Sequence, residues 1–272
     1  MTSVHLRPVE PTDYAALRRF ELDLTLGPRW RHRGATPSPE AFVQALWSGV
    51  LALYLVESSH RREPVGLVSA YGHDLQSGYA WLAAARFDPT DHPAPFLLGL
   101  RAFVDHLFAT WPLRKLYAEV LAPNLVPFAS AATTLFHQEG ILRDHAFIDG
   151  HHVDQHLLSL TRPRWNEERC RWAGTLTAPG LTPSVGDLAR DLGELLQREE
   201  DPLDVDLPLA DQGLDSLDWL IVADHLEHLG PTSETIGEAL LDHVTLRAVH
   251  RHLLEGAVLA GGPRLEPSVR DR

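Results

Sequence analysis

Cysteine is nearly absent from this sequence, since Cys170 is the only one among 272 residues. One cysteine excludes an intramolecular disulfide framework and is typical of a reducing compartment. Cys170 lies between two arginines beyond the first predicted domain, so we expect a bystander and not a nucleophile. The sequence also lacks an apolar run of the roughly 20 residues that a membrane span needs, and it opens with no signal-peptide pattern. We therefore expect a cytoplasmic protein with no membrane partner.

Basic residues are outnumbered in this chain, which carries 24 Lys and Arg against 37 Asp and Glu. The whole excess of 13 negative charges lies in one stretch, because residues 184–260 hold 17 Asp and Glu but only 4 Arg. An acidic surface argues against nucleic acid as a partner, since the phosphates would repel it. The charge fits docking onto basic patches of partner enzymes, although a solvated acidic face explains it nearly as well.

The length and the hydrophobic content of 44% predict two folded domains. Prolines and glycines without clear periodicity mark the boundary, although Trp165 and Trp172 suggest that part of it packs on the first domain. We place the domains at residues 1–164 and 183–257, with a linker at 165–182 and a C-terminal tail at 258–272. A stiff linker of this length spans up to about 60 Å, enough for one domain to reach the other.

Strand-like and helix-like patterns alternate through the first domain and predict an α+β fold with a mixed sheet flanked by helices. Expected strands lie at 4–7, 51–57, 65–71, 79–87, 115–121, 141–148 and 153–160. Helices are expected after Asp13 and at 40–49, 96–110 and 125–137.

Short sequence words in this domain occur in the order known from one enzyme family. They are Leu6-Arg7-Pro8, Pro64-Val65-Gly66, Asp105-His106-Leu107-Phe108, Asn124, Leu135-Phe136, Glu139-Gly140-Ile141-Leu142-Arg143 and Gly150-His151-His152-Val153-Asp154. Through these words residues 4–165 resemble the GNAT superfamily of N-acetyltransferases, specifically its ribosomal-protein-acetylating branch. The resemblance implies a GNAT-like sheet and transfer of an acyl group to an amine.

The coenzyme A loop of that family is altered here. GNAT enzymes hold the diphosphate in an Arg/Gln-x-x-Gly-x-Gly/Ala loop, where backbone N–H groups at a helix start bind the anion. Counting back from Phe108 places the loop at residues 91–96, which have no glycine, two prolines without N–H groups and a repelling Asp91. No Arg or Lys compensates within the loop. Acyl-coenzyme A is therefore a disfavoured donor, and either the transferase is inactive or its donor lacks the nucleotide.

The catalytic residues are less clearly marked. The tyrosine that many GNAT members use as an acid maps onto Ala131. Glu119, on the strand that lines the acceptor side in the family, is the first candidate for the base, followed by His73 and Tyr79. Tyr79 opens the strand that pairs with pantetheine in the family. Ser130 is a polar neighbour of Ala131, although a core or cap role explains it better.

Two further features are candidate binding sites. The resemblance makes Asn124 a candidate contact for the cofactor. His152, Asp154 and His156 alternate on one predicted strand and so share a face, which is a loose metal-binding pattern. Because the Gly-x-x-x-Asp word of the family explains His152 and Asp154 without a metal, we predict no metal site.

The stretch Asp215-Ser216-Leu217 opens a helix of the second domain after an acidic, proline-marked loop. Side-chain oxygens cap such a helix start, and its N–H groups and dipole favour a phosphate there. The alternative explanation is an ordinary capped helix after a turn. Helical patterns at 185–196, 216–229, 234–241 and from 246 onward predict a small bundle of four helices.

Together these features make residues 183–256 resemble an acyl or peptidyl carrier protein, whose Asp-Ser-Leu serine receives 4′-phosphopantetheine. The resemblance implies a covalent arm on Ser216, flanked by Asp215 and Leu217. It also implies two partners, a phosphopantetheinyl transferase and an enzyme that charges the carrier.

Three functions fit this combination. In the first, the GNAT-like domain moves an acyl or aminoacyl group from its own carrier to an amine of a small biosynthetic intermediate. In the second, it loads its own carrier from acyl-coenzyme A. In the third, it is a non-catalytic docking scaffold. The altered loop and the fused carrier favour the first, and by analogy we expect natural product biosynthesis as the setting.

Overall fold

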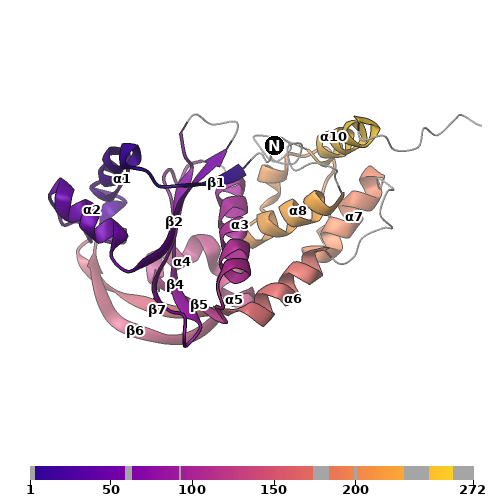
Figure 1. The fold of residues 1–272 in the computed structure, drawn as a ribbon. Helices are drawn as coiled ribbons and strands as arrows, with labels where there is room; N and C mark the ends of the chain where they lie inside the picture. The colour runs from indigo at the N-terminus through magenta and orange to yellow at the C-terminus, as the bar shows by residue number, and fades with distance from the viewer. Residues whose placement is uncertain are drawn as a thin grey trace, which may run out of the picture. The chain divides into compact units, whose positions relative to one another are not determined.

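The computed structural model describes residues 4–58, 63–91, 93–173, 184–198, 201–229 and 245–259. The chain divides into two compact units, the first of Val4–Cys170 with Asp215–Leu220 and the second of Arg171–Leu214 with the residues from Ile221 onward. Figure 1 shows the sheet in the first unit and the helices of the second. None of the described helices is both long and apolar enough to cross a bilayer.

A seven-stranded mixed sheet forms the first unit, in the order β1-β2-β3-β4-β5-β7-β6. Every neighbouring pair is antiparallel except β4 and β5, which are parallel. The expected strands are all present, so the prediction of a mixed sheet is confirmed. Their bounds are β1 Val4–Pro8, β2 Val50–Ser58, β3 Gly66–Asp74, β4 Tyr79–Arg86, β5 Lys115–Leu121, β6 His137–Ile148 and β7 His151–Thr161.

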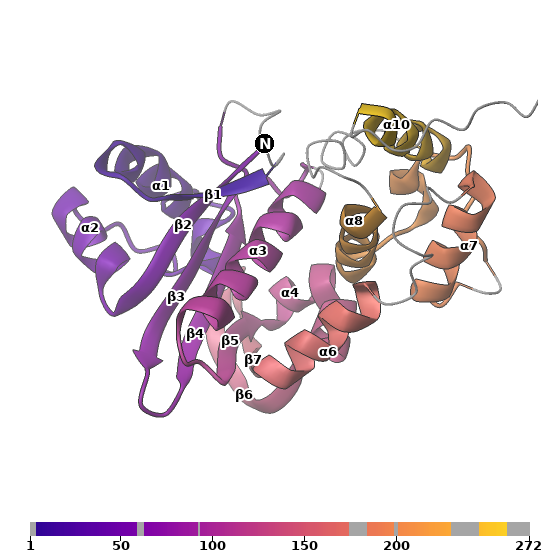
Figure 2. The same cartoon turned by 45° about the vertical axis from the view of Figure 1, so that its right-hand side comes forward.

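Helices cover both faces of this sheet (Figure 2). The helices α1 (Tyr14–Glu21) and α2 (Pro39–Trp47) lie on one face, where Leu17 and Phe42 join Leu53 and Leu67 of the sheet in one buried cluster. The long helix α3 (Ala94–Thr110) lies on the other face. It approaches β2 so closely that a Cβ on Gly99 would lie 2.3 Å from a methyl carbon of Val56. The start of α3 lies near the end of β4, because a Cβ on Gly66, which pairs with Arg86 of β4, would lie 2.4 Å from the ring of Phe96.

One predicted helix of the first unit is wrong in its extent. We expected a helix over 125–137, but the chain forms α4 (Ala122–Leu125), the 3₁₀ turn η3 (Val126–Phe128) and α5 (Ala129–Thr134), and then enters β6 at His137. A proline at the second position of η3 breaks the hydrogen-bond series, because it has no N–H group to donate. The apolar residues up to Phe136 continue the helical spacing, which hid the break from the sequence pattern.

The region predicted as a linker begins with ordered helix. Helix α6 (Arg162–Ala173) follows β7 directly, and Arg162 donates to the carbonyl oxygens of Trp111 and Leu113 at 2.8 and 2.7 Å. The indole N–H of Trp165 donates to Asp105 of α3 at 2.7 Å. Trp165 therefore packs on the first unit as its aromatic character indicated, and residues 174–183 lie outside the described part.

The second unit is helical where it is described. Its elements are α7 (Val185–Leu195), the 3₁₀ turn η4 (Leu209–Gln212), the part of α8 (Ser216–Leu229) from Ile221 onward, and α10 (Leu246–Leu259). The helix expected at 234–241 and most of the tail expected at 258–272 lie outside the described residues. Buried leucines and valine of α7, the connecting loop and α10 contribute to its core: Leu188, Leu192, Leu203, Leu209, Leu246, Val249 and Leu253.

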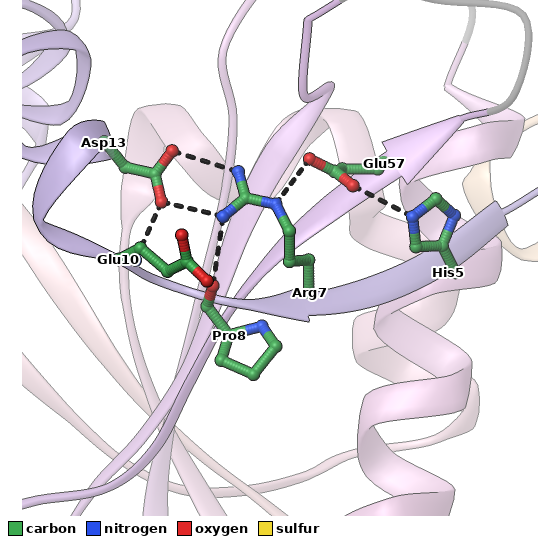
Figure 3. A network of polar contacts seen from close by, with 6 residues as sticks. All are labelled: His5, Arg7, Pro8, Glu10, Asp13 and Glu57. Atoms are coloured by element: carbon green, nitrogen blue, oxygen red, sulfur yellow. Dashed lines mark hydrogen bonds and ion pairs between the residues drawn. The ribbon is translucent and has the colours of Figure 1, made fainter.

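Arg7 joins the first strand to the first helix (Figure 3). Its guanidinium donates two hydrogen bonds of 2.9 Å to the carboxylate of Asp13 and one of 2.7 Å to Glu57 on β2. Asp13 in turn accepts the N–H of Glu10 at 2.8 Å, which closes the turn η1 (Pro11–Asp13) before α1. The hydrogen bond from Arg7 lowers the pKa of Asp13.

We expect Arg7→Met to reduce the free energy of unfolding by about 1–3 kcal/mol at pH 7, because hydrogen bonds between charged groups are lost. Asp13 has a folded pKa below its unfolded value of about 4, so its share of the stability is present above pH 4 and is lost as the pH falls through the folded pKa. Urea unfolding at pH 7 and near pH 2 checks this. An equal deficit at both pH values would contradict it.

Candidate functional site

The strands β4 and β5 stay together over only part of their length. They pair from Tyr79 and Lys115 to Trp81 and Tyr117, and in this described part of the sheet the pairing ends there. Beyond this point β4 remains paired with β3, and β5 with β7. The freed stretch of β4 carries three consecutive alanines, 83–85, which are partly exposed. An extended chain with amide groups is the kind of ligand that an unpaired strand edge binds.

The start of α3 lies just beyond β4 and is poor in hydrogen-bond donors. Pro93 is the N-cap of α3, has no side-chain cap bond, and is followed two positions later by a second proline. Residues 91–96 contain no Arg or Lys, but in the structure the guanidinium of Arg86 contacts this loop. Arg86 donates to the carbonyl oxygens of Pro89 and Asp91 at 2.7 and 3.1 Å. Burial lowers the pKa of Arg86, and the charges of Asp88 and Asp91 oppose this shift. Its guanidinium therefore holds the loop together beside two carboxylates, which is a poor environment for a diphosphate.

Glu119 lies on the sheet face that α1 and α2 cover. Register and alternation put Tyr71 of β3, Trp81 of β4, and Tyr117 and Glu119 of β5 on this face. The rings of Trp81 and Tyr117 are 5.1 Å apart, and Glu119 is exposed next to them. Burial raises the pKa of the Tyr71 phenol, the charge of Glu119 raises it further, and the charge of Arg31 opposes both. The face thus combines a carboxylate with a hydroxyl that keeps its proton at neutral pH.

The other two candidates on β3 and β4 lie away from Glu119. Tyr79 opens β4 opposite Lys115, four residues from Glu119 along β5, and its ring meets Tyr117 edge-on at 5.7 Å. Four strand residues correspond to about 13 Å. His73 is exposed at a register shift near the β3–β4 turn. The charge of Glu119 acts on Tyr71, which shares its sheet face and which the sequence analysis missed. Tyr71 could have been identified only from the strand register, which no local sequence pattern shows.

The remaining first-unit candidates lie on the helices after β5. Asn124 of α4 donates to the carbonyl oxygen of Arg29 in a long bond of 3.5 Å, so it ties the loop after α1 to this region. Ser130 is in α5, and its side chain lies outside the described part of the structure. Ala131 is buried. The cofactor contact predicted for Asn124 and the role of Ser130 stay predictions.

The alternating histidines and aspartate of β7 are bound to β6. Asp154 pairs with Arg143 at 2.5 Å and accepts the N–H of Asp144 at 3.0 Å, across a register shift of β6. His156 contacts Gln138 at 2.9 Å. These contacts give Asp154 a structural role in holding the bulged edge strand.

The second candidate site is the start of α8. Ser216 is the first residue of this helix, and Asp215 before it accepts the N–H groups of Leu217 and Asp218 at 2.8 and 3.0 Å. Asp218 accepts the N–H of Asp215 at 3.1 Å, which completes a reciprocal cap. Gly213 takes a positive φ of 71° that turns the chain into the helix. The side chain of Asp215 therefore supplies the cap of this helix start.

The loop in front of α8 is held at both ends. The side-chain amide of Gln212 donates to the carbonyl oxygens of Asp204 and Leu207 at 2.9 Å and accepts the N–H of Asp204 at 2.9 Å. Arg247 at the start of α10 forms a two-pronged pair with Asp206 at 2.6 and 2.9 Å. These bonds hold the loop that precedes Ser216.

We expect Asp215→Ala to lower the stability of the second unit by about 1 kcal/mol, since two N–H groups of α8 lose their acceptor. Asp215→Asn keeps an acceptor oxygen and is the matched control. Thermal unfolding and the rate of serine modification by a phosphopantetheinyl transferase measure the effect. An alanine variant that matches the asparagine variant in both would show that the cap is dispensable.

Two solved structures show the fold of the first unit. Spermidine N-acetyltransferase from Vibrio cholerae, in complex with CoA and spermine, is 17% identical over 60% of this chain and 98% of its own, with a TM-score of 0.52. RimL, a ribosomal L7/L12 alpha-N-protein acetyltransferase in complex with coenzyme A, is 16% identical over 59% of this chain and 95% of its own, with a TM-score of 0.50. The GNAT-like fold predicted from the sequence words is confirmed.

The second unit matches a known family by sequence. Residues 186–253 match the family described as phosphopantetheine attachment site. This region is therefore a carrier domain that bears 4′-phosphopantetheine on a serine, which requires a phosphopantetheinyl transferase and an enzyme that loads the arm. A search of curated proteins found no match to the chain.

Proposed function

We propose that this protein is an acyltransferase that moves an acyl or aminoacyl group from the phosphopantetheine arm on Ser216 to an amine of a small biosynthetic intermediate. The observation that carries the proposal is the start of α3, where Pro93 and the engaged Arg86 replace a diphosphate site. A carrier arm has the pantetheine half of coenzyme A but no nucleotide diphosphate. The altered loop and the fused carrier domain therefore have one common explanation.

The arm has a place to bind in the first unit. The edge of β4 beyond Trp81 is not paired with β5, and the side chains at 83–85 on it are small. The two amide groups of pantetheine match such an edge, because each can exchange hydrogen bonds with strand backbone. Tethering raises the local concentration of the arm to roughly millimolar, so the nucleotide contacts are not needed for affinity.

Glu119 and Tyr71 supply the proton chemistry in this proposal. The amine nitrogen attacks the thioester carbonyl carbon, the C–S bond breaks, and the products are an amide and the thiol of the arm. Glu119 takes the proton that the amine loses. The Tyr71 hydroxyl, which stays protonated, donates toward the negative charge that develops on the carbonyl oxygen or the leaving sulfur. The proton on Glu119 finally passes to the thiolate, which balances the reaction.

The experiment follows the acyl group by the intact mass of the full chain. The holo protein is acylated on its arm and incubated with and without candidate amines. We expect the acyl mass to disappear only with an amine, together with the appearance of the amide. Equally fast loss from a chain shortened to residues 183–272 would contradict the proposal.

Loading of the arm from acyl-coenzyme A is the second candidate function. It is favoured by the two similar structures, both of which contain coenzyme A. It requires measurable coenzyme A binding by the first unit, and calorimetry on the full apo chain tests this. Coenzyme A binding that persists in Ala94→Asp would show that the diphosphate does not lie at the start of α3.

A further inference from the structure

The loop between α1 and α2 is strongly basic. Its second part, residues 27–37, reads Gly-Pro-Arg-Trp-Arg-His-Arg-Gly-Ala-Thr-Pro, with three arginines, one histidine and no acidic residue. Asp23, the acidic residue of the first part, accepts the N–H groups of Thr25 and Leu26. The loop contains the 3₁₀ turn η2 (Gly27–Arg29) and then crosses toward α2. This charge is local, because the residues outside 184–260 hold equal numbers of acidic and basic side chains.

This loop reaches over the sheet face that carries Tyr71 and Glu119. The guanidinium of Arg33 donates to the side-chain oxygen of Gln155 on β7 at 3.2 Å. Gln155 is buried and pairs with Leu121 of β5, which lies two positions after Glu119 on the same face. The charge of Arg31 acts on Tyr71 in the same region. The described contacts therefore fasten the basic loop beside the proposed acceptor site.

The positive charges of the loop are balanced unequally. Arg29 pairs with Asp149 at 3.3 Å, and His32 pairs with the buried Glu21 at 2.9 Å. The charge of Arg31 also acts on Glu21. For Arg33, the residues that the structure describes provide the neutral Gln155 but no carboxylate within ion-pair distance. Among the described residues of this face, Arg33 is thus a cation with no ion-paired carboxylate, and Arg31 is a second one, whose charge acts on Glu21.

The backbone of Arg33 is also unusual. It has a φ of 52°, in the left-handed region that non-glycine residues rarely adopt, and Gly34 follows with a φ of 83°. A residue held there costs about 1 kcal/mol or more and persists when its surroundings require it. The contact with Gln155 is what this conformation provides, since it directs the guanidinium across the sheet.

From these contacts we propose that the acceptor carries an oxyanion, a carboxylate or a phosphate, in addition to its amine, and that Arg33 binds this group with Arg31 close by. The inference rests on the proposed function, because it names the substrate class of the same site. The amine lies at Glu119, and the anion lies at the end of the face where the loop reaches β7. A polyamine, which has no anionic group, is a poor substrate in this arrangement.

The test uses the full holo chain with an acylated arm and three acceptors on the same aminoethyl chain: β-alanine, β-alaninamide and 2-aminoethylphosphonate. Spermidine is the fourth acceptor and represents an amine without an anionic group. We expect an acid to be acylated with a kcat/KM at least tenfold above that of the amide and of spermidine, since charge-assisted hydrogen bonds are lost without the anion. Preference between β-alanine and the phosphonate identifies the oxyanion.

Variants then locate the contact. Arg33→Gln should raise KM for the preferred acid about tenfold or more with little change in kcat, and should leave β-alaninamide unchanged. Arg19→Gln removes the same charge from an exposed position on α1 and is the matched control. Acylation of the amide or spermidine as efficiently as the acids would overturn the inference and leave the proposed function intact. Equal losses with acid and amide in Arg33→Gln would also overturn it. No acylation of any amine would remove the proposed function and the inference together.

Discussion

Replacing Ser216 by alanine is expected to abolish both the attachment of phosphopantetheine and the transfer of the acyl group. The match over residues 186–253 requires a serine as the attachment point, and that range contains only two, Ser216 and Ser233. Ser216 opens α8, where Asp215 has already taken the role of the cap. No other described feature of the second unit combines a serine with a helix start and a braced loop.

The measurement is intact mass after incubation with coenzyme A and a phosphopantetheinyl transferase. Ser233→Ala is the matched control and should be modified like the unaltered chain. Acyl transfer by Ser216→Ala should fall to the uncatalysed background, because no arm is present. Modification that persists in Ser216→Ala and disappears in Ser233→Ala would move the attachment point to Ser233.

Glu119→Gln should reduce the rate of acyl transfer by a factor of about 10²–10⁴, the usual contribution of a positioned base. Glutamine keeps the size of the side chain, and Glu119 is exposed, so the fold should be unaffected. The arm should be attached and charged normally, and the acyl group should then remain on the carrier in the presence of the amine. Glu167→Gln, at an exposed position on α6, removes one carboxylate elsewhere and should have no effect.

A mixture of the two variants distinguishes transfer within one chain from transfer between chains. Ser216→Ala keeps a complete first unit, and Glu119→Gln keeps a loaded carrier. If the arm serves its own chain, the mixture at low concentration stays as slow as Glu119→Gln alone. Activity that recovers in proportion to the concentration of Ser216→Ala would show that carriers serve neighbouring molecules.

The strands and the attachment stretch could be predicted because their signals are local. Continuous apolar runs on either side of a polar turn define β2 and β3, and the acidic loop before Asp215 and Ser216 marks a helix start within a few residues. The prolines near the start of α3 were also readable, since their missing N–H groups follow from residue type alone. The prediction of one helix over 125–137 also relied on a local signal, the helical spacing of the apolar residues. It was wrong because the chain forms α4, η3 and α5 there instead.

The sequence by itself determined that a carrier domain follows a transferase-like domain. It also determined that the coenzyme A loop of that domain has no glycine and two prolines without N–H groups, because residue type and short spacing decide those properties. Only the tertiary structure decided that Tyr71 shares a face with Glu119, that Arg86 lies under the altered loop, and that Arg33 reaches Gln155 across 122 positions of the chain. The physical reason is that strand register and loop crossing depend on packing between distant segments. A change of one residue in register would turn Tyr71 to the opposite face, and no local pattern records that choice.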